Sequence, residues 1–96
     1  MKKNNILITG GSVRIGREIC LAVASNLNNL IIHYNRSSSQ ASNLKKTIEK
    51  LGSKCAIVKC DLSKKRNIEN LINKSGEFFG PINCLINNAS VFENDN

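Results

Sequence analysis

Short apolar runs alternate with longer amphipathic segments along this chain, and that alternation constrains its fold more than any other feature. The apolar runs are residues 5–9, 30–34, 54–60 and 82–87, and the amphipathic segments between them are 15–27, 38–51 and 64–79. The runs do not alternate strictly between apolar and polar residues, which is typical of strands buried on both faces. The sequence therefore predicts an α/β fold in the order β-α-β-α-β-α-β, with a parallel sheet and helices on both faces.

The three amphipathic segments carry apolar residues at helical spacing. The first segment places five of them on one face: Ile15, Ile19, Ala22, Val23 and Leu27. We expect this face to pack on the sheet. Gly52 stands where the second helix would end, and Ser63 is the expected N-cap of the third.

The size and composition of the chain exclude several classes of protein. With 96 residues, 41% of them hydrophobic and only 4% aromatic, the chain can form one small domain with a mainly aliphatic core. The sequence contains no membrane-spanning run and no recognisable secretory signal. We therefore expect a cytoplasmic protein without a membrane partner.

The cysteines and the net charge narrow the possible ligands. Cys20, Cys55, Cys60 and Cys84 show no CxxC spacing and lie within apolar runs, so we expect reduced core cysteines and no metal site. The charge of +7 is spread along the chain with almost no aromatic residues for base stacking. Nucleic-acid binding is therefore disfavoured, and an acidic small molecule would fit the charge equally well.

A glycine-rich stretch, TGGSVRIG at residues 9–16, joins the first apolar run to the first amphipathic segment. Gly10 and Gly16 would allow close backbone approach, and the helix N-terminus behind them would favour a pyrophosphate. In a β-α-β context this pattern predicts a dinucleotide loop at the start of a Rossmann-type sheet, the first half of a doubly wound domain. A turn that serves tight packing alone is the alternative.

The end of the second apolar run indicates which dinucleotide would bind. Sites for NAD usually carry an acidic residue there, whereas this chain has none between Glu18 and Glu49. Arg36 and the hydroxyls of Ser37 and Ser38 could instead hold a 2′-phosphate by charge-assisted hydrogen bonds. The sequence therefore favours NADP(H), the alternative being a solvated arginine on a loop.

Three motifs together resemble the short-chain dehydrogenase/reductase family: TGGSVRIG, CDLS at 60–63 and INNAS at 86–90. The resemblance covers the whole chain. It implies that Asp61 and Leu62 border the adenine, that Asn88 and Ala89 line the cofactor, and that Asn87 braces the sheet. With the loop and the end of the second run, the predicted cofactor-binding set is Gly10, Ser12, Arg14, Ile15, Gly16, Tyr34, Asn35, Arg36, Ser37, Asp61, Leu62, Asn88 and Ala89.

A narrower resemblance is to the pteridine reductases and dihydromonapterin reductases. These are similar to this chain in a TGxxxR(I/L)G loop, in HY-x-RS at 33–37 and in NNAS-x-F at 87–92. The resemblance implies that Arg14 reaches the cofactor phosphates, where most of the family has glycine. It also implies that Ser90 and Phe92 contact the substrate, with Phe92 stacked on a pterin. A 3-oxoacyl carrier-protein reductase, or a sugar or alcohol dehydrogenase, is the alternative within the family.

The catalytic Tyr-x-x-x-Lys pair of this family has no match in the chain. The only tyrosine, Tyr34, is followed four residues later by Ser38. We therefore expect residues 1–96 to be a truncated NADP(H)-binding domain without the catalytic C-terminal half, inactive by itself. The full-length form would be a homo-oligomer acting on a small molecule, a pterin by the resemblance. A non-catalytic NADP(H)-binding module is the alternative from another class.

Overall fold

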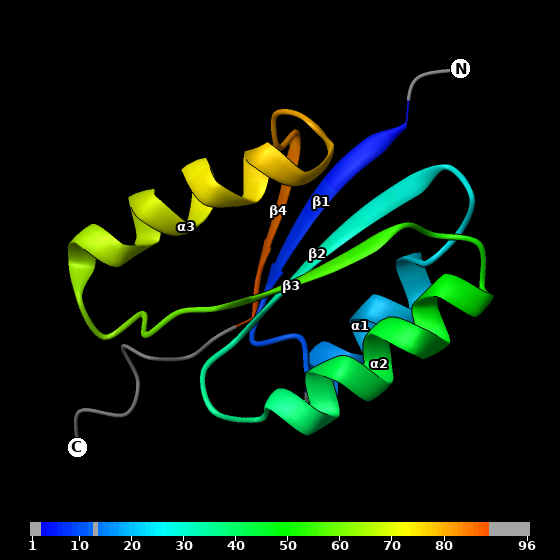
Figure 1. The fold of residues 1–96 in the computed structure, drawn as a ribbon, viewed down its shortest axis with the longest axis horizontal. Helices are drawn as coiled ribbons and strands as arrows, with labels where there is room; N and C mark the ends of the chain where they lie inside the picture. The colour runs from blue at the N-terminus through cyan, green and yellow to red at the C-terminus, as the bar shows by residue number, and fades with distance from the viewer. Residues whose placement is uncertain (1–2, 13, 89–96) are drawn as a thin grey trace.

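The computed structural model describes residues 3–12 and 14–88, which form four strands and three helices in the predicted order (Figure 1). Along the chain these are β1 (Asn4–Thr9), α1 (Arg14–Val23), β2 (Asn28–Tyr34), α2 (Ser38–Lys50), β3 (Cys55–Lys59), α3 (Lys65–Phe79) and β4 (Cys84–Asn87). Within this part of the chain no helix is long and apolar enough to cross a bilayer.

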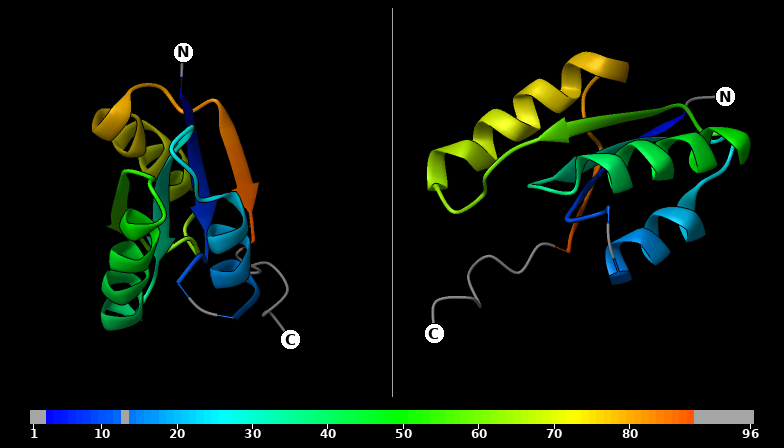
Figure 2. Two further views of the ribbon diagram at one scale, coloured as in Figure 1. Left: turned by 90° about the vertical axis from the view of Figure 1, so that its right-hand side faces the viewer. Right: turned by 60° about the horizontal axis from the view of Figure 1, so that its bottom comes forward.

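The four strands form one parallel sheet in the order β3-β2-β1-β4. Helices α1 and α2 cover one face of the sheet and α3 covers the other (Figures 1 and 2), which confirms the predicted Rossmann-type fold. Because β4 lies on the opposite side of β1 from β2, the strand order reverses next to β1. In such sheets, ligands bind outside the carboxyl ends of the strands at this reversal.

The core has two layers, which follow from the two-residue period of the strands. Beneath α1 and α2 lie Ile6, Ile8, Leu30 and Ile32, packed against Cys20, Leu44, Ile48 and Cys55. Beneath α3 lie Leu7 and Ile31, packed against Ala56, Val58, Leu62 and Leu71. The central strands therefore bury both faces, as the apolar runs predict.

Helix α1 is shorter than its apolar pattern predicts. It ends at Val23, whose carbonyl oxygen accepts a hydrogen bond from the Asn28 side chain (Nδ2 to O, 2.7 Å). This bond pairs a carbonyl at the end of the helix that has no partner within the helix. Because Asn28 is the first residue of β2, the bond also ties the end of α1 to the start of that strand. Ile15 and Leu27, at the two ends of the predicted apolar face, are 70% and 47% exposed, so the face packs on the sheet only between them.

Two smaller predictions are also wrong. Ser63 is not the N-cap of α3: Lys64 holds that position, and the backbone N–H of Ser63 instead donates to Asp61 (N to Oδ1, 2.9 Å). Cys84 is exposed on the edge strand β4, so it is not a core residue here. By contrast, Gly52 follows the last turn of α2 with a φ of +103°, as expected for a helix terminator.

Candidate cofactor-binding site

The glycine loop begins directly after β1, at the reversal of strand order. Gly10 has a φ of +63°, a left-handed conformation that glycine adopts without strain. Gly16, in the first turn of α1, is buried against Gly10, and a Cβ atom there would collide with the Gly10 carbonyl oxygen. It would also lie 2.7 Å from Nδ2 of Asn88. The backbone path of the loop therefore requires glycine at position 16 and favours it at position 10.

Gly10 is held from both neighbouring strands. Its N–H donates to the His33 ring at the end of β2 (N to Nδ1, 2.9 Å). Its carbonyl oxygen accepts from the side chain of Asn88, just after β4 (Nδ2 to O, 3.1 Å). These contacts hold Gly10 between the ends of β2 and β4.

The contacts of His33 also define its protonation state. Nδ1 accepts from Gly10, so Nε2 must carry the proton and donate to the carbonyl oxygen of Cys60, 2.7 Å away. His33 is only 3% exposed, and this burial lowers its pKa, against the opposing effect of the bond to Cys60. A neutral imidazole therefore ties the glycine loop to the end of β3.

A second chain of hydrogen bonds crosses from β1 to β4. The Thr9 hydroxyl donates to Asn87 (Oγ1 to Oδ1, 2.8 Å) and accepts from the backbone N–H of Asn88 (2.9 Å). Asn87 thus braces the sheet, as predicted. The same bonds orient Asn88 toward Gly10, and they place Asn88 beside the loop.

Arg14 adopts a left-handed backbone conformation, with a φ of +52°, and its side chain is exposed. A non-glycine residue there carries strain, and such strain is commonly found at functional sites. The left-handed backbone explains why a glycine would suit this position.

At the end of β2, Tyr34 is half-buried, while Asn35 and Arg36 are exposed. Ser37 precedes α2 as its N-cap, but its hydroxyl makes no capping hydrogen bond, and α2 has no acidic residue in its first turn. An N-terminus without negative charge in its first turn, next to an arginine and a hydroxyl without a capping role, is suited to bind an anion.

Asp61 lies near Arg36, across the carboxyl ends of β2 and β3. Its pKa is lowered mainly by the hydrogen bonds from Ser63, with a smaller contribution from the Arg36 charge. Asp61 is exposed and therefore free to accept from a ligand, whereas the Leu62 side chain is 4% exposed and packs in the core.

The remaining predicted site residues differ in exposure, and three of them cannot be placed. Ser12 is buried in the loop, and Ile15 is exposed on the first turn of α1. Ala89, Ser90 and Phe92 lie outside the described residues. Among the residues that the structure describes, no group of three or more His, Cys, Asp or Glu side chains could hold a metal ion.

Sequence reasoning missed His33 as a site residue, because its two partners lie 23 and 27 residues away. It also missed Arg17 and Gln40, which line a groove beside the loop. The apolar run that contains His33 offered one signal: a lone imidazole within a buried strand needs hydrogen-bond partners.

Known proteins match most of the length of this chain. A family model for short chain dehydrogenases matches residues 4–96. The L-rhamnose 1-dehydrogenase (NADP(+)) of Thermoplasma acidophilum is 37% identical over 90 residues, which are 94% of this chain and 35% of that protein. A short-chain dehydrogenase/reductase homolog of Bacillus subtilis, YusS, is 29% identical over 88% of this chain and 78% of its own length.

Among solved structures, FolM alternative dihydrofolate reductase 1 from Brucella canis, complexed with NADP, superposes with a TM-score of 0.81. It is 33% identical, over 91% of this chain and 35% of that one. The chain thus spans about a third of the length of the rhamnose dehydrogenase and of the FolM reductase.

Proposed function

Since the chain belongs to the short chain dehydrogenase family, we propose that it is the NADP(H)-binding portion of an NADPH-dependent oxidoreductase. NADP is the expected nicotinamide cofactor, because relatives of this chain are named for NADP(+) or are complexed with NADP. The activity, substrate and partners of the whole protein are part of the proposal.

The observation that carries the proposal is the glycine loop fixed by His33 and Asn88. The N–H and the carbonyl of Gly10 are both hydrogen-bonded. Gly16 leaves open the space that a Cβ atom would fill. A phosphate group of a ligand can therefore approach the loop and the N-terminus of α1 closely. The residues present fit a pyrophosphate, and Arg14 would supply positive charge beside it.

The choice of NADP(H) over NAD(H) rests on Arg36 and Ser37. They lie at the N-terminus of α2, with no acidic side chain in its first turn. A 2′-phosphate there would meet a guanidinium and a hydroxyl without a capping role, whereas a ribose 2′-OH would find no carboxylate acceptor in this loop. Asp61, which follows the neighbouring strand β3, would accept from the amino group of an adenine.

This chain can bind and orient the cofactor, while the hydride itself would come from the nicotinamide of bound NADPH. No Tyr-x-x-x-Lys pair is present in the 96 residues. We therefore propose that proton donation to the substrate requires residues other than these, and that the chain alone is inactive.

For the substrate we propose a pteridine of the dihydrobiopterin, dihydromonapterin or dihydrofolate type. The support is the arginine in the loop, the NNAS-x-F motif at 87–92 and the similarity to a dihydrofolate reductase of the FolM type. The similarity to a rhamnose dehydrogenase favours a sugar as the second candidate. Adding dihydrobiopterin to the NADPH-loaded chain should raise its thermal midpoint, and Phe92→Ala should remove this shift. A shift with L-rhamnose and none with the pterin would favour the sugar.

A non-catalytic NADP(H)-binding module is a further candidate, favoured by one observation. The chain covers 78% of the length of the Bacillus homolog, so that relative offers few residues beyond the matched ones. The oxidoreductase and the non-catalytic module would require the same cofactor site.

Titration of Arg36→Ala with NADPH and NADH tests the cofactor assignment. Loss of a charge-assisted hydrogen bond costs about 1.5–3 kcal/mol, so NADPH should bind about 10- to 100-fold more weakly, with NADH unchanged. Lys50→Ala, in the last turn of α2 and so at the opposite end of that helix from Arg36, is the control and should leave both affinities unchanged. An Arg36→Ala variant that keeps its preference for NADPH would contradict the assignment.

A further inference from the structure

The hydrogen bond between His33 and the glycine loop depends on the charge of the imidazole. Nδ1 can accept from the N–H of Gly10, 2.9 Å away, only while it carries no proton. In the imidazolium form both ring nitrogens are donors, so the N–H at Nδ1 would point at the N–H of Gly10. Protonation of His33 is therefore incompatible with the loop conformation that the structure shows.

The imidazole has little room to avoid this conflict. It is buried, and its Nε2 is held by the carbonyl oxygen of Cys60 at 2.7 Å. Turning the ring over would put C–H groups in place of both nitrogens and leave Gly10 and Cys60 without their partner. Gly10 has more freedom, because it is a glycine in the loop that follows β1. A protonated His33 would therefore displace the loop.

The groups that face His33 from the neighbouring elements offer it no buried negative charge. Strand β1, Asn4–Thr9, has no ionisable side chain. At the end of β3, burial raises the pKa of the Cys60 thiol, which is therefore neutral, and Asp61 is exposed. From α3, Lys74 lies near Cys60 and is itself a cation. Burial is the main cause that lowers the pKa of His33, and the opposing cause is its bond to a carbonyl oxygen, not to a carboxylate.

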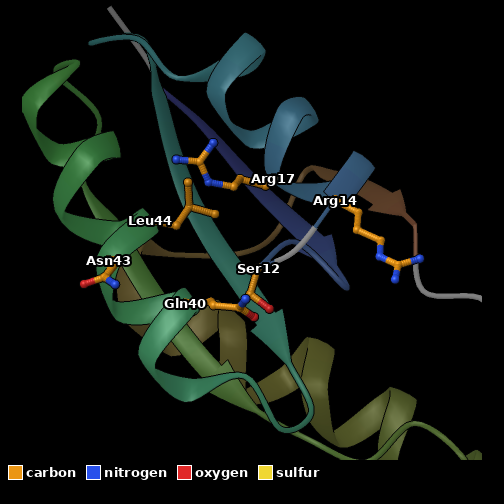
Figure 3. Close-up of a pocket in the computed structure, with 6 residues that line it drawn as sticks. All are labelled: Ser12, Arg14, Arg17, Gln40, Asn43 and Leu44. Carbon is orange, nitrogen blue, oxygen red and sulfur yellow. The ribbon is translucent and has the colours of Figure 1, made fainter.

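The arginines near the loop do not compensate either. Because alternate residues of a strand point to opposite faces, His33 points to the α3 face, as does Ile31. Arg17 extends toward α2 on the other face, and Arg14 points away on the far side of the loop (Figure 3). Arg36, which follows β2, is exposed. All three are cations, so they disfavour a further positive charge at this edge of the sheet.

We propose that His33 makes the affinity of the chain for its dinucleotide depend on pH, because the neutral imidazole holds the glycine loop in its binding form and protonation releases it. His33 acts through Gly10 and is therefore a positioning residue. The inference rests on the proposed function and adds a regulation of the same site. Affinity is complete above the pKa of His33 in the free chain, which burial places below the usual value of about 6.5. As the pH falls through that pKa, affinity is lost by at most about tenfold per pH unit.

The linkage also has a reciprocal consequence. If protonation of His33 weakens dinucleotide binding, then the bound dinucleotide must lower the pKa of His33. The negative phosphates acting by charge alone would instead raise that pKa. The direction of the change therefore separates release of the loop from simple charge attraction.

The first test measures this direction by nuclear magnetic resonance on the unsubstituted chain. The sequence contains one histidine, so the ring C–H signals of a single imidazole report the pKa of His33. The signals are followed between pH 5.0 and 8.0, with and without saturating NADP+. A pKa that falls when NADP+ is bound is the expected result. A pKa that NADP+ leaves unchanged or raises would overturn the inference.

The second test compares the NADP+ affinities of the parent chain and His33→Gln by calorimetric titration at pH 8.0 and 5.0. The glutamine amide offers one acceptor and one donor but does not titrate. The 2′-phosphate of the probe has a second pKa of about 6, so both chains should lose some affinity in acid. The parent chain should lose about three- to tenfold more than His33→Gln. Lys46→Gln, an exposed residue of α2, is the control and should keep the profile of the parent chain.

The outcomes separate the inference from the proposed function. Equal losses of affinity in the parent chain and His33→Gln would overturn the inference and leave the cofactor proposal intact. Failure of the parent chain to bind NADP+ at pH 8.0 would overturn the proposed function and the inference together. The resonance measurement needs no variant, so it decides the question even where His33→Gln does not fold.

Discussion

Replacing His33 by leucine should destabilise the fold by about 2–4 kcal/mol, because both hydrogen bonds between the glycine loop and β3 would be lost. The N–H of Gly10 and the carbonyl of Cys60 would each lose a partner, at about 1–3 kcal/mol for a buried group. Both residues are only partly buried, which limits the sum. A domain of this length has a total stability of about 5–14 kcal/mol, so the variant should fold with a clearly lower midpoint.

His33 should also make the stability depend on pH. Burial lowers its pKa in the folded chain, so the unfolded chain binds the proton more tightly. The stabilisation is therefore complete above the unfolded pKa of about 6.5 and is lost as the pH falls through the folded pKa. The slope from one such group is at most about 1.4 kcal/mol per pH unit. Because the sequence contains one histidine, this window reports on His33.

Urea denaturation followed by circular dichroism, between pH 5.0 and 8.0, would measure both effects. His33→Gln is the matched variant, since its amide offers one acceptor and one donor but does not titrate. It should lose the slope below about pH 6.5 and retain more stability than His33→Leu. Two results would refute the role of His33 in joining the glycine loop to the end of β3. One is an equal pH dependence of stability in the parent chain and His33→Gln, and the other is a loss of stability below about 1 kcal/mol in His33→Leu.

Three further substitutions or modifications test other parts of the site. Arg14→Gly should raise the free energy of unfolding by up to about 1 kcal/mol, because glycine adopts the left-handed backbone of this position without strain. The same substitution should weaken NADPH binding. Urea denaturation would measure the gain in stability, and titration with NADPH would measure the loss of affinity. Gly16→Ala should cost about 1–3 kcal/mol or more and abolish nucleotide binding, because its Cβ meets the loop carbonyl, and the same two assays apply. Iodoacetamide should modify exposed Cys84 well before Cys20 and Cys55, whose pKa values burial raises to about 12; mass spectrometry against time would reveal any reversed order.

Local patterns were sufficient to predict the strand and helix order and the place of the glycine loop. Both depend on the spacing of neighbouring residues, such as the continuous apolar run of β2 and the glycines at 10 and 16. The end of α1 was not predictable in this way. It depends on Asn28, beyond the helix, which takes the Val23 carbonyl that a longer helix would have used.

The anchoring of the loop was also beyond local reasoning. Asn88 reaches Gly10 across 78 residues of sequence, and His33 reaches it across 23. Only the parallel register of β2, β1 and β4 brings these side chains to one edge of the sheet. The left-handed backbone of Arg14 likewise becomes visible only in the structure, although the arginine itself stood out from the glycine pattern.

Isothermal titration of the unsubstituted chain with NADPH and with NADH tests the central claim most directly. If the fixed glycine loop binds the pyrophosphate and the loop after β2 binds the 2′-phosphate, NADPH should bind at least about tenfold more tightly than NADH. Equal affinities, or no binding of either dinucleotide, would contradict the account.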